Sequence, residues 1–219
     1  MILPAILMLL QAVPTAPADP KPAEWPDPER ESAMGDTRIA EYDSVSARKT
    51  MALYAACVAE SSADKVSAVL VRDFRTTEYR NGLKNLSSAN EGCARKVGLR
   101  NSDRLRMGNL PFAAALAEVM IASDGEPLKS RLARAAAGKT TETFAPSDAV
   151  AMCVVRSVPD DVTALLQSEP GSEAETSTEA KLLPVARMCA DGTRVEATTL
   201  GLRSIIATAT FRLLAAQEG

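Results

Sequence analysis

Four cysteines are the residues whose number and spacing most clearly indicate chemistry in this chain. They form two pairs, Cys57 with Cys93 and Cys153 with Cys189, and the members of each pair are 36 residues apart. In an oxidising compartment such cysteines form disulfides far more often than they act as nucleophiles. Since four cysteines permit three pairings, the spacing predicts cross-links without fixing their connectivity.

Histidine is absent from all 219 residues. Catalytic triads that depend on histidine, imidazole general bases, His-Glu-x-x-His zinc sites and haem ligation by histidine are therefore excluded. With the cysteines oxidised, a transition-metal site would need several converging carboxylates, and no spacing of acidic residues suggests one. We therefore predict no metal and no cofactor.

Two short motifs match parts of known catalytic or binding patterns. Ser62-Ala63-Asp64-Lys65 fits the serine–lysine pattern of penicillin-recognising enzymes, but the partner motifs that this chemistry needs do not occur. Gly138-Lys139-Thr140 fits the end of a phosphate-binding loop, but Ala133 stands where its first glycine should be. We interpret the first as a helix-start serine with a surface lysine and the second as a helix C-cap. Neither motif predicts a catalytic residue.

The amino terminus has the pattern of a secretory signal peptide. Residues 1–13 are uncharged and mostly apolar, and Ala16-Pro17-Ala18 supplies a cleavage site of small residues. The apolar run is shorter than the roughly 20 residues that a membrane-spanning helix needs. We therefore expect a signal peptide over residues 1–18, export to the periplasm or secretion, and no membrane-spanning segment.

A proline-rich segment follows and predicts a disordered tether over residues 19–43. Four prolines in the ten residues 19–28 block helix formation and leave an extended chain. Trp25, the only tryptophan, lies inside this segment. It can serve as an anchor for a partner, because tryptophan carries a large apolar area, or it can fold back onto the domain.

Composition indicates packed helices without a nucleic-acid partner. Alanine is abundant and aromatic residues make up only 4% of the chain, a mixture that favours helices over strands. The formal net charge is -3, from 25 basic and 28 acidic residues that are well interspersed. Phosphate binding needs a concentrated basic patch, so this distribution argues against nucleic acid.

The body of the chain repeats itself at an offset of 96 residues. This offset places Cys57 on Cys153 and Cys93 on Cys189 without a gap, and eleven of the 40 positions from 55 to 94 are identical. Chance would give about three to four identities in so alanine-rich a chain. The sequence therefore predicts an internal duplication.

Each copy has the periodicity of four helices, so the predicted fold is all-α. Repeat 1 covers residues 44–122, a linker with a short helix (126–137) covers 123–143, and repeat 2 covers 144–219. Both copies have an apolar triplet at i, i+3, i+4 that is expected to point inward, and so are Leu128 and Leu132 of the linker helix; the triplets are Val66, Val69 and Leu70, and Val162, Leu165 and Leu166. The four helices of repeat 1 are expected near 44–60, from Ser61, over 77–93 and around 112–119; those of repeat 2 are expected from Ser147, from Ser157, over 176–189 with a kink at Pro184, and around 202–213 after a change of offset to 90. Glu118 points away from the apolar stripe of its helix and is expected to be solvated.

The duplication also predicts the disulfide pairing. A unit that folded alone before it was duplicated should close its own bond, which pairs Cys57 with Cys93 and Cys153 with Cys189. A closed loop of this length contributes on the order of 3.8 kcal/mol in the chain-entropy description.

The segment Tyr54-Ala55-Ala56-Cys57-Val58 is followed by a second cysteine in the same unit, and this pattern is the basis of a resemblance to a known group of proteins. The chain resembles exported, duplicated two-cysteine helical proteins of Gram-negative alphaproteobacteria, a group with no assigned function. The resemblance covers residues 57–120 and 153–214. It implies a periplasmic address and no particular activity.

These patterns together predict a non-catalytic exported protein that binds a partner, an unknown protein or a component of the cell envelope. Two alternatives stay open. One is a hydrolase or lyase that acts on an envelope polymer through carboxylates, which would require converging acids of perturbed pKa. The other is a periplasmic chaperone or inhibitor, which would require an exposed apolar patch or groove.

Overall fold

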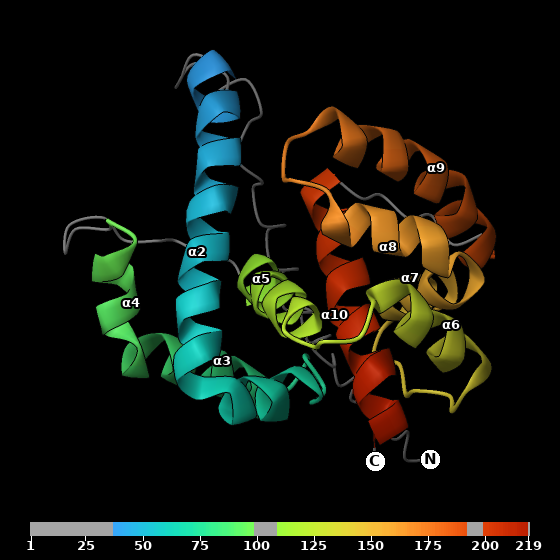
Figure 1. Cartoon of the computed structure of the whole chain (residues 1–219), viewed down its shortest axis with the longest axis horizontal. Coiled ribbons are helices and arrows are strands. Elements are labelled where there is room, and N and C mark those ends of the chain that lie inside the picture. Colours follow the sequence, from blue (N-terminus) through green and yellow to red (C-terminus); the bar gives the residue numbers. More distant parts are fainter. Residues whose placement is uncertain (1–36, 99–108, 192–198, 219) are drawn as a thin grey trace, which may run out of the picture.

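The structure is a computed structural model that describes residues 37–98, 109–191 and 199–218, with side chains from 45 to 98, 109 to 191 and 200 to 217. Within these ranges every regular element is a helix, as the sequence predicts (Figure 1). The predicted signal peptide, 1–18, and Trp25 lie outside the described residues. The helices are α2 (Thr37–Leu70), α3 (Thr77–Ala89), α4 (Glu91–Lys96), α5 (Asn109–Ala122), α6 (Leu128–Ala137), α7 (Pro146–Ser157), α8 (Pro159–Gln167), α9 (Glu173–Cys189) and α10 (Thr199–Glu218).

The helices form two units that meet through their last helices. Unit 1 comprises α2 to α5 and unit 2 comprises α7 to α10, and the linker helix α6 packs on α7 and α8 of unit 2. In Figure 1, α5 and α10 lie in the middle, between the other helices of unit 1 and the other helices of unit 2. These two helices pack directly against each other. None of the described helices is long and apolar enough to cross a bilayer.

Two pairs of positions 96 residues apart have the same backbone role. The helix that begins each unit breaks at Ser62 in unit 1 (φ -150°, ψ 35°) and at Val158 in unit 2 (φ -136°, ψ 60°). Helix α3 of unit 1 is capped by Thr76, and helix α9 of unit 2 is capped by Ser172. Each hydroxyl accepts a hydrogen bond from the backbone N–H three residues later. The offset therefore describes the backbone as well as the sequence.

The last helices match at the offset of 90. The pattern of buried and half-buried positions over 112–118 recurs, residue for residue, over 202–208. Equal burial at equivalent positions means that α5 and α10 present equivalent faces to the core and to each other.

One apolar core runs through both units. The triplet that the sequence placed inward in unit 1 is buried, and in unit 2 Val162 and Leu165 are buried while Leu166 is half-buried. Leu128 and Leu132 of the linker helix are buried as predicted. Burying side chains of this size contributes about 1.5–3 kcal/mol each, so these helices are held mainly by packing rather than by helix propensity.

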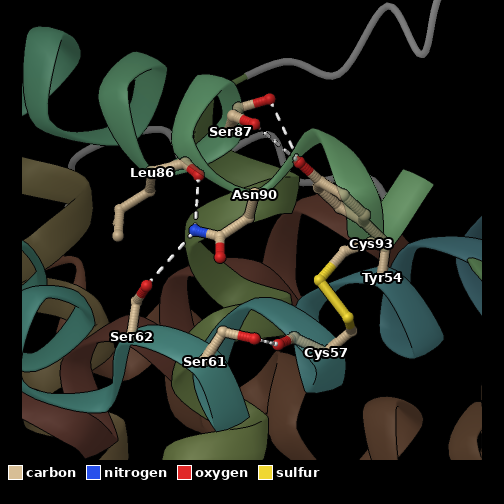
Figure 2. Close-up of a disulfide and its surroundings, with 8 residues drawn as sticks. All are labelled: Tyr54, Cys57, Ser61, Ser62, Leu86, Ser87, Asn90 and Cys93. Atoms are coloured by element: carbon tan, nitrogen blue, oxygen red, sulfur yellow. Dashed lines mark hydrogen bonds between the residues drawn. A yellow bond between two sulfur atoms is a disulfide. The ribbon is translucent and has the colours of Figure 1, made fainter. Parts of the chain in front are cut away.

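Both predicted disulfides are confirmed. Cys57 is bonded to Cys93 and Cys153 to Cys189, with Cα–Cα distances of 5.7 and 5.8 Å. Each bond ties the first helix of its unit to the segment that ends the third. Figure 2 shows the first of them, with the Tyr54 hydroxyl 3.2 Å from the Ser87 hydroxyl beside it.

Several predicted helix boundaries are wrong. Helix α2 begins at Thr37 rather than near residue 44, so the predicted tether, 19–43, overlaps a helix; the overlapping residues contain neither Pro nor Gly. Helix α7 begins at Pro146 instead of being capped by Ser147, because proline is preorganised for the first helical position. The Ser61 hydroxyl does not cap a new helix. It donates back to the Cys57 carbonyl oxygen at 2.9 Å, as serine does inside a helix.

The third helices also differ from the prediction. In unit 1 the predicted helix over 77–93 is divided at Asn90 into α3 and α4. In unit 2, α9 begins at Glu173 and is a single helix through Pro184. Pro184 is exposed, so the backbone carbonyl that it leaves without a partner can be reached by water. The second helix of unit 2 begins after Val158 with no cap from Ser157.

Candidate functional site

The contact between the units is reciprocal. The start of α2 in unit 1 reaches the loop before α9 in unit 2, where a Cβ at Gly171 would lie 2.7 Å from Val45. In the opposite direction Phe144, which precedes α7 in unit 2, meets Phe74 in the loop before α3 at a ring-centroid distance of 6.0 Å. Reciprocal contacts of this kind characterise two-fold interfaces. They create two equivalent places, one on each side of the α5–α10 contact.

The first place, which we call the ion-pair site, is filled by four charged side chains and one serine: Arg48, Glu118, Glu175, Arg203 and Ser168. Arg203 of α10 is bidentate to Glu118 of α5, with two N–O distances of 2.8 Å, and is 2.9 Å from a Glu175 oxygen. It also donates to the Ser168 carbonyl at 3.2 Å. Arg48 of α2 pairs with Glu175 from the other side. Glu175 and Arg203 are only 1% and 4% exposed.

The electrostatics of the ion-pair site keep its carboxylates ionised. Burial by itself would raise the pKa of Glu175, because a charged carboxylate loses its hydration. Hydrogen bonds from Arg48, from the Gly171 N–H and from Arg203 outweigh burial and hold this pKa below its ordinary value. Paired buried charges of this kind are costly to separate, so the site is a fixed connection between the units.

The second place is a cavity of about 160 Å³, which we call the interface pocket. It lies between the α2–α3 connection of unit 1, the start of α5, and helices α7 and α10 of unit 2. Its walls are mostly apolar, and a few polar groups stand among them. The lining residues are Leu70, Arg72, Phe74, Tyr79, Asn109, Leu110, Ser147, Asp148, Ile205, Thr208 and Arg212.

Arg212 and Asp148 form a buried ion pair in the pocket wall. The second carboxylate oxygen of Asp148 accepts the backbone N–H of Phe144 at 2.8 Å, so both of its oxygens are engaged. The Arg212 guanidinium stacks over the Phe144 ring at 4.9 Å and donates to the Glu142 carbonyl at 3.4 Å. Its Nε, however, is buried without a hydrogen-bond partner. Such a donor is costly to leave unsatisfied.

Tyr79 supplies a second polar group to the pocket. Its ring is buried, and its hydroxyl makes no hydrogen bond to another described residue, while its backbone N–H is held by Thr76. Burial raises the pKa of Tyr79 to about 12, although the positive charge of Arg212 works in the opposite direction. The hydroxyl therefore keeps its proton at neutral pH and can act as a hydrogen-bond donor.

The two places differ because equivalent positions carry different side chains. Arg203 corresponds to Ala113 and Glu118 corresponds to Thr208, so short side chains stand on the pocket side where long charged groups fill the ion-pair site. Glu175 corresponds to Tyr79. The same backbone arrangement is thus filled by side chains on one side and encloses a cavity on the other.

The residues that the sequence singled out lie elsewhere. The four cysteines lie in the disulfides inside the units, and the Ser62 hydroxyl accepts a hydrogen bond from Asn90 at 3.3 Å (Figure 2). Lys65 is exposed, and Gly138 is the C-cap of α6, as predicted. Among the described residues, no group of three or more Cys, Asp or Glu side chains is arranged to hold a metal.

Sequence reasoning missed the polar residues of both places. Glu118 was expected to be solvated, but it is only 25% exposed and pairs with Arg203. The usable signal was in the last helix, where Arg203 and Arg212 interrupt an otherwise apolar segment. Buried arginines require partners, but the partners lie far away in the sequence.

Comparisons with known proteins do not assign the chain to a family. Neither the protein-family models, nor the curated proteins, nor the solved structures contain a match to it.

Proposed function

We propose that this chain is a non-catalytic exported binding protein that takes a small molecule with an apolar body into the interface pocket. The observation that carries the proposal is the pocket itself, an apolar cavity with a few polar groups between two cross-linked units. Ligand sites commonly have this composition and lie between structural units. A cavity of about 150 Å³ suffices for a benzene-sized ligand, so the pocket suits one ring or a short chain.

Export is supported by the cysteines. Both disulfides are formed and the described residues contain no free cysteine, a pattern typical of oxidising compartments. The amino-terminal pattern of residues 1–18 is consistent with this address. A periplasmic location would also agree with the proteins that the chain resembles.

The environment of two buried acids, Glu175 and Asp148, supports binding over hydrolysis. A carboxyl group that acts as a general acid needs a raised pKa. The pKa of Glu175 is instead held low by arginines, and Asp148 is occupied by Arg212 and the Phe144 N–H. These two carboxylates also lie in different places, one in each of the equivalent sites. The arrangement thus favours binding over the carboxylate-based enzyme.

The distribution of exposed apolar side chains supports a small ligand over a protein client. The large apolar side chains that are exposed do not gather in one place along the chain. They are Leu53, Val71, Leu110, Leu183, Met188 and Leu200. Of these six, Leu110 lines the pocket. A chaperone surface would gather such residues into one patch.

Filling the pocket tests the proposal. Ile205 is half-buried and lines the pocket, so Ile205→Trp should occupy the space that an aromatic ligand would use. Toluene and indole serve as probes, and their binding to the mature chain is followed by NMR chemical shifts and by the melting temperature. We expect the wild type to bind and Ile205→Trp to lose binding at least tenfold.

The matched control is Leu53→Trp, because Leu53 is exposed on α2 and does not line the pocket. It should bind the probes as the wild type does. Probe binding that survives Ile205→Trp, or a wild type that binds neither probe, would refute the proposed site.

A further inference from the structure

We infer that the ligand of the interface pocket is an anionic amphipath, a carboxylate head on an apolar body of about six carbons. The inference rests on the proposed function and specifies its ligand class. It comes from the polar groups that line the pocket, from their net charge, and from the way the ion-pair site uses the equivalent position.

Two polar groups of the pocket can donate hydrogen bonds to a ligand, the Arg72 guanidinium and the Tyr79 hydroxyl. The Tyr79 hydroxyl retains its proton and makes no hydrogen bond to another described residue. The one carboxylate in the lining, Asp148, has both oxygens engaged. The Thr208 hydroxyl donates to main-chain carbonyls of its own helix at 3.1 Å. A ligand that pairs with Arg72 and Tyr79 must therefore bring acceptors.

The charge of the lining favours an anion. Two arginines and one aspartate line the pocket, and Asp148 neutralises Arg212. This leaves the positive charge of Arg72, which makes no ion pair with another described residue, at the exposed edge of the pocket. Hydrogen bonds from a charged donor to a carboxylate are roughly twice as strong as neutral ones. An amine head would instead meet a like charge.

The ion-pair site shows what a carboxylate does at the equivalent position. There Glu118 reaches across from α5 and satisfies an arginine of the facing helix with two contacts of 2.8 Å. In the pocket the equivalent residue is Thr208, whose short side chain supplies no carboxylate. The arginine is also missing there, because Ala113 corresponds to Arg203; a ligand carboxylate would instead meet Arg72 and Tyr79, which stand at the positions of Ser168 and Glu175.

The volume limits the apolar part. About 160 Å³ accommodates one aromatic ring or a chain of about six carbons. Leu70, Phe74, Leu110 and Ile205 supply the apolar contacts. Long-chain fatty acids would have to leave most of their chain outside the cavity.

A series of ligands with one body and three heads tests the inference. Hexanoate, 1-hexanol and hexylamine, and in parallel benzoate, benzyl alcohol and benzylamine, are titrated into the mature chain by calorimetry at pH 7. We expect the carboxylates to bind about tenfold more tightly than the alcohols, because they match the donors and the surplus charge. We expect no measurable binding of the amines.

Two variants locate the head group, and a third is the control. Arg72→Gln should weaken carboxylate binding about fivefold to tenfold without changing alcohol binding, and Tyr79→Phe should weaken the carboxylates severalfold. Arg75→Gln is the matched control, because Arg75 is an exposed arginine paired with Asp73 outside the pocket. It should leave every affinity unchanged.

The outcomes separate the inference from the proposed function. If alcohols or amines bind as tightly as the carboxylates, or if Arg72→Gln and Arg75→Gln behave alike, the anionic head is wrong while the pocket stands. If the carboxylates fail to bind although toluene does, the inference is again overturned. If no ligand of either series binds and toluene does not bind either, both the inference and the proposed function are wrong.

Discussion

The ion-pair site and the interface pocket lie at equivalent places in two units of matching backbone, yet side chains fill the first and leave a cavity at the second. The helix breaks, the caps and the burial pattern of the last helices agree between the units. The difference arises from a few positions, chiefly Ala113 against Arg203 and Thr208 against Glu118. Similar backbones at the two places therefore do not imply that the two places are filled alike.

The comparison also shows that the two sides differ in how they connect the units. A buried arginine stabilises the ion-pair site only while both of its acids are present. The pocket carries no such network across the units, because Arg212 and Asp148 belong to the same unit. A ligand can therefore enter the pocket without breaking a connection that holds the units together.

Removing the central arginine should have the largest effect. Arg203→Met leaves Glu175 and Glu118 buried or half-buried without their shared partner, so we expect the free energy of unfolding to fall by about 3–5 kcal/mol. Urea unfolding at pH 7, followed by circular dichroism, measures this loss. Arg72→Met, the same change at the edge of the pocket, should cost less than about 0.5 kcal/mol. Equal losses for the two variants would contradict the difference between the sites.

Breaking each disulfide compares the two units directly. Cys57→Ser and Cys153→Ser should each lower the free energy of unfolding by about 2–5 kcal/mol. Since both bonds close loops of 36 residues, the entropic part should be the same, and denaturant unfolding of the two variants should give losses within about 1 kcal/mol. A much larger loss in one unit would show that the folded units depend unequally on their cross-links. Non-reducing peptide mapping of the wild type supplies the control for pairing.

Equivalent positions 79 and 175 should respond to opposite ends of the pH scale. The pKa of Tyr79 is raised from an ordinary 10.0 to about 12. Its contribution to the free energy of unfolding, about 2–3 kcal/mol, is therefore fully present below pH 10 and is lost as pH rises towards 12. The lowered pKa of Glu175 gives stability that is present above about pH 4.5 and is lost as pH falls through its folded value.

Melting temperatures across pH, with Tyr79→Phe and Glu175→Gln, measure the two effects separately. Tyr79→Phe should flatten only the alkaline limb, and Glu175→Gln should flatten only the acid limb. If either variant changes the opposite limb instead, the assignment of the pKa shifts to these two places is wrong.

The smallest effect concerns the helix break. In unit 1 the Asn90 amide donates to Ser62 and to the Leu86 carbonyl (Figure 2), whereas Val158 and Ala186 occupy these two positions in unit 2. Ser62→Val alone and Asn90→Ala alone should each cost about 1 kcal/mol, because one partner is left unsatisfied. The double variant copies unit 2 and should cost less than the sum of the singles. Strictly additive losses in urea unfolding would show that the two side chains do not interact.

Local patterns in the sequence predicted most of the fold. The all-α class, the disulfide pairing, the linker helix and the inward triplets follow from spacing and helical periodicity, which adjacent residues carry. Helix ends were predicted less well. None of Ser61, Ser147 and Ser157 is the expected N-cap. The helix continues through Ser61, and α7 and α8 each begin with a proline at the first helical position.

The sequence by itself therefore determined the two units, their cross-links and the correspondence of their residues, because each depends on short-range periodicity and on cysteine spacing. Only the tertiary structure decided which polar side chains are buried together. Arg203 lies 85 positions from Glu118 and 28 from Glu175, and Arg212 lies 64 from Asp148. Arg203 and Glu118 pair because α5 and α10 face each other across the unit boundary, whereas the other two pairs form where α10 packs on α9 and α7 within unit 2. Packing geometry alone sets that relation, since no periodicity within one helix records which distant residue will stand opposite it.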